Sequence, residues 1–593
     1  MLLKHLFLKN IIFFYFRTMK LKSFFPILES LSTHTAADWR KDLIAGITVA
    51  VMLVPQGMAY AMLAGMPPIY GLYTGLIPLF LYAIMGTSRQ MSIGPVAVSS
   101  LLVLAGVSQL AEPFSSEYVV LVIMTGLLVG TAQLLMGFLR LGFLVNFISH
   151  PVIVGFTSAA AMIIAISQLK DFFGIKIPRF SHSYETAQYA FQHIAEANWV
   201  SVAICLGGII IMLILRKISR AIPGALLVVI LSTIMVYVLG EDKLGVDLVK
   251  EVPKGLPAFQ MPMMDWKTIM ILLPVVFTVT VIEIVESISI AKVIQSKHGD
   301  YQIRPNQELV ALGVSKIGGS FFQAIPSSGS FTRSAVNNEA GAQSGVASIV
   351  TGVIIALTLL FLTPLFYFLP KAILASIILL SVKSLFEWEE AVHLWNKHRQ
   401  DFYMMLTTFF VTLGFGIEQG VMAGVVLSIL MVLYRSSKPH MVVLGKLPDS
   451  INYRNVDRFD TVKQAEDILV VRFDDQLYFG NASHFQDTIQ EFVVEKGEDL
   501  RLFVLDASSI HSIDSTGIHA LEEVFKYLNA RNVQLYVSGM IGPVRDKVIQ
   551  CGLMKLMGGE SHFLNVHQAV VYFQGLDEGG NDWSADAIQT NVL

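Results

Sequence analysis

The sequence predicts an all-α polytopic membrane domain followed by a small α/β domain, and three observations support that fold class. Hydrophobic residues make up 54% of the 593 residues and charged residues only 15%, whereas soluble chains carry about 25% charged residues. Long apolar runs recur from about Leu43 to Tyr434. Beyond Tyr434 charges become frequent and strand-like runs alternate with helical ones, which is typical of a compact α/β domain.

The apolar region divides into fourteen segments, several of them shorter than the ~20 residues that a helix needs to cross a bilayer. Short segments fit helices that end at mid-membrane inside the protein. The basic residues before the first segment and after the second, fourth, sixth, eighth, twelfth and last segments all fall on one side when fourteen spans are counted, and the loop after the seventh is acidic. This predicts a multi-pass protein of the plasma (inner) membrane with both termini cytoplasmic. The predicted segments are 45–64, 69–86, 94–110, 118–138, 144–169, 199–215, 222–240, 269–294, 307–323, 330–342, 346–369, 372–386, 401–416 and 418–435.

Composition also predicts the domain limits. The apolar stretch Leu6–Phe16 is too short to span and lacks a small-residue cleavage site, so no signal peptide is expected, and the sequence leaves open whether the chain starts at Met1 or Met19. We expect an N-terminal cytoplasmic segment (1–37), a transmembrane transport domain (38–437), a linker (438–459), the α/β domain (460–575) and a disordered tail (576–593).

Three stretches of the membrane region combine helix-breaking residues with apolar ones. Pro55, Gln56 and Gly57 interrupt the first segment, and a proline there is tolerated only where the backbone faces protein or water. "SIGPVAVSSLL" (92–102) and "AIPSSGSFTRSAV" (324–336) each predict a half-helix that begins at membrane depth. The free amides of such a start carry roughly half a positive charge, so two of them aimed at one point would bind an anion.

The spacing of these features suggests two related halves. Gln56 precedes Pro95 by about forty residues, and Glu286 precedes Ser330 by a similar interval. Paired interrupted segments in two halves are typical of secondary transporters built from inverted repeats, with the substrate at the bilayer midplane. The pattern therefore predicts a transport site at mid-membrane.

Charged residues inside the segments are the candidates for coupling and binding. Glu283 and Glu286 share a helix face, and each charge costs about 2.5–3.5 kcal/mol on insertion scales. Glu286 is expected to hold a proton or neutralise a coupling cation, and a nearby second carboxylate favours protonation. The alternative is a structural carboxylate paired with a neighbouring helix. Arg333, at the start of a half-helix, is explained if an anion sits there; its alternative is a salt bridge to Glu286.

Gln56 and Tyr60 lie four residues apart on one helix face and are expected to contact an oxyanion, with ordinary packing as the alternative for Tyr60. The chain has no GxxxxGK[ST] motif and no metal-ligand spacing among its His and Cys residues. We therefore expect no cofactor, no bound metal, no ATP-driven step and no enzymatic activity.

Five stretches resemble the sulfate permease (SulP) family, and the resemblance covers nearly the whole chain. They are "VPQGMAYAMLAGMPPIYGLY", "GTSRQMSIGPVAVSSLL", "ESISIAK", "NQELVALGVSKIGGSFF" and "SGSFTRS". "DASSIHSIDSTGIHAL" is similar to the STAS domain that follows the membrane part in this family. The resemblance implies a seven-plus-seven inverted repeat, core and gate subdomains and a homodimer.

The same resemblance implies which residues act. Glu286 sits where proton-linked members carry a carboxylate, and some members have an aromatic residue where Val96 stands, so a slightly wider pocket is expected. Thr516 takes the place of a serine that is phosphorylated in STAS-type anti-sigma antagonists; the alternative is that it caps the following helix. The implied substrate-binding residues are Gln56, Tyr60, Val96, Ala97, Ser330, Phe331, Thr332 and Arg333.

Together these observations predict a secondary active transporter of a small inorganic oxyanion, above all a sulfate:proton symporter working by alternating access. Sodium-coupled bicarbonate transport, an anion channel and a regulatory scaffold acting through the C-terminal domain are the alternatives. A cytoplasmic partner of that domain is expected, and no nucleic acid. The sequence leaves the anion, the coupling ion and the stoichiometry open.

Overall fold

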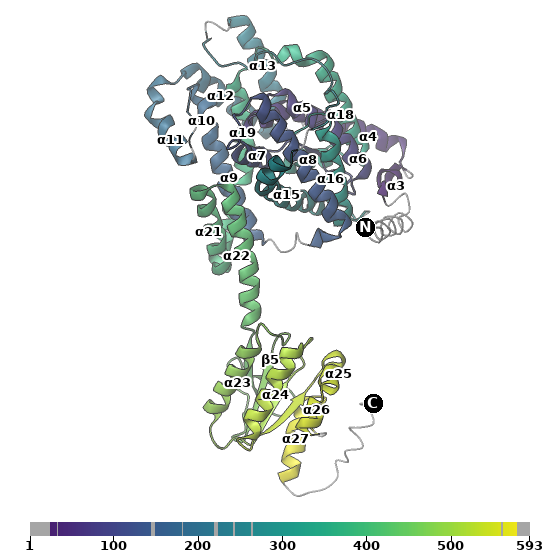
Figure 1. The fold of residues 1–593 in the computed structure, drawn as a ribbon, viewed down its shortest axis with the longest axis vertical. Coiled ribbons are helices and arrows are strands. Elements are labelled where there is room, and N and C mark those ends of the chain that lie inside the picture. Colours follow the sequence, from purple (N-terminus) through teal and green to yellow (C-terminus); the bar gives the residue numbers. More distant parts are fainter. Residues whose placement is uncertain are drawn as a thin grey trace. The chain divides into compact units, whose positions relative to one another are not determined.

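The computed structural model describes residues 24–31, 34–143, 149–178, 180, 182–218, 223–240, 244–262, 265–299, 301–558 and 561–577. The chain divides into two compact units, Met1–Ser428 and Ile429–Leu593, each considered by itself below (Figure 1). The apolar stretch 6–16 and most of the tail predicted at 576–593 lie outside the described residues.

The membrane unit is mainly helical in the described ranges, and each of the fourteen predicted segments corresponds to a helix or a pair of helices there (Figure 1). Among the described residues, seven helices are long and apolar enough to cross a membrane. The predicted polytopic fold class is thus confirmed. The segments are α4 (Ala36–Leu63), α5 (Ile69–Thr74) with α6 (Ile77–Met85), α7 (Ala97–Val107), α8 (Ser116–Phe138), α9 (His150–Ser167), α12 (Trp199–Ile218), α13 (Gly224–Leu239), α15 (Trp266–Gln295), α16 (Pro305–Ser320), α17 (Phe331–Glu339), α18 (Val346–Leu357), α19 (Lys371–Val382), α21 (Arg399–Phe415) and α22 (Ile417–Ser437).

Shorter helices connect these segments. They are α3 (Ile27–Leu31), α10 (Leu169–Phe173), α11 (Ser183–Gln192) and α20 (Trp388–Lys397).

The first long helix, α4, runs straight through the residues expected to interrupt it. It starts at a capping box, in which the Thr35 side chain accepts from the Asp38 amide while Asp38 accepts from the Thr35 amide. Pro55 lies inside the helix, and the helix ends only before Gly65, which has a positive φ of 73°. The half of α4 around Pro55 is buried in protein, so the donor lost at proline is tolerated without a break.

Glycines set the close approach of α4 to α5. A Cβ on Gly71 would clash with the carbonyl oxygen of Gly57, so the two backbones are in direct contact there. We expect Gly71→Ala to destabilise the membrane unit by about 1–3 kcal/mol, the usual effect of overpacking a filled core. Melting of the purified protein in detergent measures this. Gly207→Ala is the control, because a Cβ there meets nothing within 4 Å, and equal melting temperatures for the two variants would contradict the prediction.

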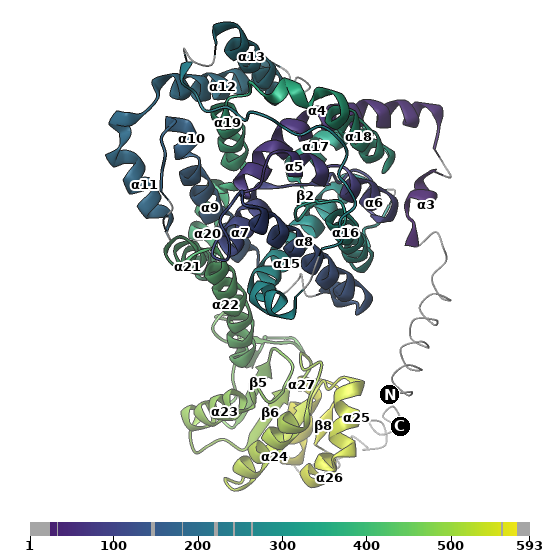
Figure 2. The same cartoon turned by 45° about the horizontal axis from the view of Figure 1, so that its top comes forward.

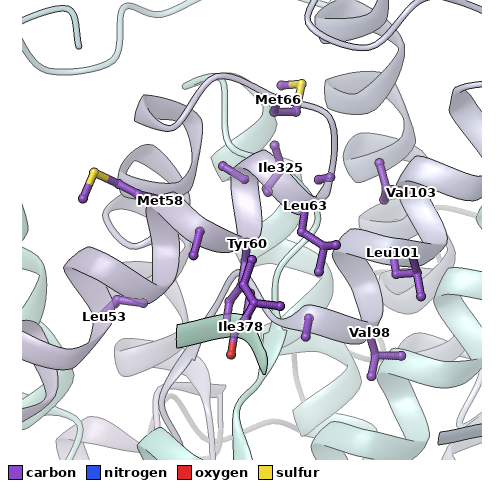
Figure 3. Close-up of a cluster of buried hydrophobic side chains, with 14 of the residues drawn as sticks. Leu53, Met58, Tyr60, Leu63, Met66, Val98, Leu101, Val103, Ile325 and Ile378 are labelled. Carbon is purple, nitrogen blue, oxygen red and sulfur yellow. The ribbon is translucent and has the colours of Figure 1, made fainter. Parts of the chain in front are cut away.

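Apolar side chains from distant segments fill the space around the α4 midpoint. Figure 3 shows Leu53, Met58 and Tyr60 of α4 beside Val98 of α7 and Ile378 of α19, all of them buried. α4 also packs against α17 and α18. The helix that carries Gln56 is therefore held against both half-helices.

The second unit is an α/β domain with one six-stranded sheet in the order β4-β3-β5-β6-β7-β8. Strands β5 to β8 are parallel, and β3 runs antiparallel to β4 and to β5. The central strands are apolar at nearly every position because helices cover both faces of the sheet. The strands are β3 (Met441–Lys446), β4 (Tyr453–Asn455), β5 (Ile468–Phe473), β6 (Leu502–Asp506), β7 (Gln534–Ser538) and β8 (His562–Phe563).

Helices α23 and α24 pack with one core of this sheet, and α27 packs with a second core (Figure 2). This confirms the predicted α/β class. Strands β3 and β4 lie within 438–459, the range predicted as a linker; they are short and flanked by glycine, proline and polar residues, so no strand pattern stands out there. The helices are α23 (Ala482–Lys496), α24 (Ser515–Asn529), α25 (Gly542–Gln550), α26 (Leu553–Met557) and α27 (Val566–Asp577).

Candidate functional site

Two half-helices start from one short pair of strands inside the membrane unit. Strand β1 (Ile93–Gly94) pairs antiparallel with β2 (Ser328–Gly329), with Ile93 opposite Gly329. The pair is extended by the amide of Ser330, which donates to the Ser92 carbonyl over 3.0 Å. Three residues after β1 the chain enters α7, and two residues after β2 it enters α17. The pairing therefore places the two helix N-termini beside each other, as the two interrupted stretches predict.

Arg333 is the most deeply buried charge at these helix starts. Its side chain is 0% exposed, and Nη1 donates to the Pro95 carbonyl over 3.1 Å, which ties α17 to the segment leading into α7. Nε and Nη2 have no hydrogen-bond partner in the described part of the chain. Gly94 leaves room for the guanidinium, because a Cβ there would lie 3.2 Å from Nη2.

No carboxylate of the described residues lies within 4.0 Å of the Arg333 guanidinium, so the salt bridge to Glu286 considered from the sequence is not formed. A buried charge with unsatisfied donors is costly unless another group compensates it. Guanidinium nitrogens and helix starts are both groups that are able to bind anions.

The other residues predicted to bind substrate surround this point on three elements. Gln56 and Tyr60 are buried on α4, and Val96 and Ala97 are buried at the start of α7. Tyr60 lies near enough to Arg333 to interact with it electrostatically, and Ser381, near the end of α19, is a further polar neighbour of Tyr60. Tyr60 therefore packs among apolar side chains, as Figure 3 shows, and also lies near Arg333.

The first turn of α17 has one buried and one open side. Ser330 is buried and its Oγ accepts from the Arg333 amide over 3.4 Å, which makes it the N-cap. Phe331 is 57% exposed and Thr332 is also exposed. These two predicted residues lie on the exposed side of the turn, and Arg333 lies on its buried side.

Glu286 lies on α15 next to β2. Ser328 Oγ donates to its Oε2 over 3.4 Å, and the neighbouring Ser287 Oγ accepts from the Gly329 amide over 3.0 Å. Within the described ranges no lysine, arginine or histidine nitrogen comes within 4.0 Å of its carboxylate, so Glu286 forms no ion pair there. Glu286 and Arg333 still interact electrostatically across the site.

Glu283, the second carboxylate expected to favour protonation of one of the pair, has a cationic partner of its own. Its Oε2 lies 3.1 Å from Nζ of Lys316 on α16, and both side chains are 0% exposed. The same ammonium donates to Gln133 Oε1 over 2.8 Å. The sequence analysis missed Lys316 and Gln133, although a lysine inside an apolar segment is itself a signal of an intramembrane partner.

In the α/β domain, Asp514 rather than Thr516 caps α24. Asp514 Oδ1 accepts from the Gly517 amide over 2.7 Å, and Oδ2 accepts from the Phe479 amide over 3.0 Å. Thr516 is an exposed residue of the first turn. The capping role considered for Thr516 is thus wrong, and its phosphorylation stays a prediction.

Replacing the cap should therefore affect stability where replacing the threonine does not. We expect Asp514→Ala to destabilise the α/β domain by about 1 kcal/mol, the usual cost of a lost N-cap, and Thr516→Ala to change it by less than about 0.5 kcal/mol. Amide hydrogen exchange in α24 of the full-length protein measures both. Equal loss of protection in the two variants would contradict this assignment.

Comparison with known proteins covers both units. Residues 39–408 match the model of the sulfate permease family, and residues 461–569 match that of the STAS domain. The chain is 38% identical to the chloroplastic sulfate transporter 4.1 of Arabidopsis thaliana over 92% of this chain and 82% of that protein. It is 34% identical to the high affinity sulfate transporter 2 of Stylosanthes hamata, over 93% and 87%.

Solved structures share the fold. The murine Solute Carrier 26 family member A9 anion transporter in its inward-facing state superposes with a TM-score of 0.87 at 26% identity, covering 94% of this chain and 96% of that one. The transmembrane domain of the cyanobacterial bicarbonate transporter BicA superposes with a TM-score of 0.58 at 20% identity, covering 66% and 98%; this second likeness concerns the fold alone.

Proposed function

The chain belongs to the sulfate permease family, and on that premise we propose that it carries sulfate across a membrane together with protons. Transport of an anion by a permease, rather than catalysis, agrees with the sulfate transporters that match over most of its length. The proposal makes two further statements: the transported anion is sulfate, and protons are transported with it.

The observation that supports anion binding most directly is the guanidinium of Arg333, which is buried between two helix starts and has two nitrogens without a hydrogen-bond partner among the described residues. Sulfate offers four acceptor oxygens and two negative charges. A guanidinium presents its donors in a fixed fork that matches such an oxyanion. The amides that open α7 and α17 supply further donors.

The remaining predicted residues take roles around that charge. Gln56 and Tyr60 contact the anion from the side of α4. Val96 and Ala97 supply the small, apolar start of α7. Ser330 holds the first turn of α17 in place by capping it. Phe331 and Thr332 line the side by which the anion enters, because they are exposed.

Glu286 carries the coupling proton in this proposal. It faces the same strand pair as Arg333 and has no cationic partner within the described residues. A neutral Glu286 removes a negative charge from the neighbourhood of a divalent anion, whereas a charged Glu286 compensates Arg333 when the anion has left. Core and gate subdomains then move against each other to expose the site alternately.

Location and assembly stay predictions. The chain is a multi-pass membrane protein. The plasma (inner) membrane, cytoplasmic termini and a homodimer are proposed, and the similarity to a chloroplastic transporter gives a second membrane to examine.

Uptake by the purified protein in liposomes tests the function. We expect saturable uptake of labelled sulfate that rises when the outside is acidified and does not need sodium. Uptake of bicarbonate driven by sodium would favour the alternative transporter, and large single-channel currents would favour an anion channel. A rate of sulfate uptake that does not change under an imposed pH gradient would contradict proton symport.

A further inference from the structure

Three helices of the membrane unit meet at a buried cluster of opposite charges. Nζ of Lys316 on α16 lies 3.1 Å from Oε2 of Glu283 on α15, and both side chains are 0% exposed. The same nitrogen donates to Oε1 of Gln133 on α8 over 2.8 Å. One ammonium therefore joins α8, α15 and α16 through charge-assisted hydrogen bonds.

Close helix packing brings the lysine to this place. A Cβ on Gly130 of α8 would lie 2.8 Å from Cβ of Lys316, and a Cβ on Gly313 of α16 would lie 2.6 Å from the Leu134 amide nitrogen. Glycines thus let α8 and α16 touch along their backbones. The side chain of Lys316 is fully buried, so its charge depends on the carboxylate beside it.

Glu283 lies one helical turn from Glu286 on α15. The charged groups on the elements that pack against this part of α15 are Lys316 on α16 and Arg333 on α17, while α8 presents the neutral Gln133. On α7, Ser99 is buried with its hydroxyl unpartnered within the described ranges, as is Oε1 of Glu283. If the lysine charge were removed, the buried carboxylate would become neutral by taking a proton.

We propose that Lys316 is a positioning residue for proton coupling: by holding Glu283 as its charged partner, it leaves Glu286 as the one carboxyl group on α15 that takes up a proton. The proposal rests on the proposed function, in which Glu286 carries the coupling proton. The new element is Lys316 on α16, which determines which carboxyl group of α15 binds the proton. Without Lys316, two carboxyl groups on adjacent turns would take up protons.

Four proteins in liposomes test this: the wild type, Lys316→Met, the double variant Lys316→Met/Glu283→Gln, and Lys292→Met, which removes an exposed lysine from the same helix α15. Labelled sulfate uptake is measured against pH, together with the protons taken up per sulfate. For Lys316→Met we expect the midpoint of the pH profile to move by about one pH unit or more and the protons per sulfate to rise. The double variant and Lys292→Met should keep the wild-type midpoint and ratio.

A folded Lys316→Met variant with the wild-type profile and ratio would overturn the proposal, as would a double variant that keeps the altered profile. If Lys316→Met does not fold, melting temperatures in detergent provide the test. We expect the double variant to fold again. A double variant that also fails to fold would show that Lys316 does not act through Glu283. Wild-type uptake without any pH dependence would instead contradict the proposed symport, and the melting temperatures would still test the pairing.

Discussion

Replacing Arg333 with methionine is expected to lower the affinity for sulfate by at least about a hundredfold. A hydrogen bond to a charged group contributes about 1.5–3 kcal/mol, and the two unpartnered nitrogens of Arg333 can make two of them. Methionine fills a similar volume with no donor. No carboxylate of the described residues forms an ion pair with this charge, so the loss should concern the anion more than the fold.

Arg333→Lys separates charge from geometry. Lysine keeps the positive charge but cannot present the planar fork or donate to the Pro95 carbonyl in the same way. An intermediate affinity is therefore expected. Sulfate binding by calorimetry and initial uptake in liposomes measure both variants, with Arg216→Met at the exposed end of α12 as the control.

Wild-type sulfate affinity in a folded Arg333→Met protein would remove the main support for the anion site. The melting temperature decides whether a loss of uptake reflects binding. If Arg333→Met melts like the wild type and sulfate no longer raises its melting temperature, the effect lies in the site.

The membrane segments could be predicted where one local sequence feature was sufficient to locate a helix. Apolar runs locate helices because spanning segments must satisfy their backbone internally. The half-helices α7 and α17 could be predicted because Gly-Pro or Pro-Ser-Ser-Gly precedes a short apolar stretch. The helix interruption predicted at Pro55 is wrong, because α4 is continuous and the surrounding protein tolerates the missing backbone donor.

Contacts between segments could not be predicted in the same way. The choice between Lys316 and Glu286 as the neighbour of Glu283 depends on how α8, α15 and α16 pack, and that depends on backbone contacts at Gly130 and Gly313. That Nε and Nη2 of Arg333 have no hydrogen-bond partner among the described residues is likewise a property of the packed site. A sequence shows that a charge lies in the membrane, but only the fold shows which charges are already paired.

Replacing Glu286 with glutamine is expected to abolish the accumulation of sulfate driven by a pH gradient while leaving sulfate exchange in place. Glutamine resembles the protonated carboxyl in shape and charge, so the variant should bind and translocate the anion without moving a proton. For one proton per sulfate, each unit of pH difference contributes about 1.4 kcal/mol, or tenfold in accumulation. That factor should disappear.

The accumulation ratio at steady state under an imposed pH gradient measures this effect, and exchange of internal for external labelled sulfate serves as the test of function. Glu117→Gln at the exposed start of α8 is the matched control. Loss of both accumulation and exchange would mean that Glu286 is needed for binding or movement, not for coupling alone. Gradient-driven accumulation that survives in Glu286→Gln would assign the proton to another group, and Glu283, buried one turn away with an unpartnered oxygen in the described structure, would be the first to examine.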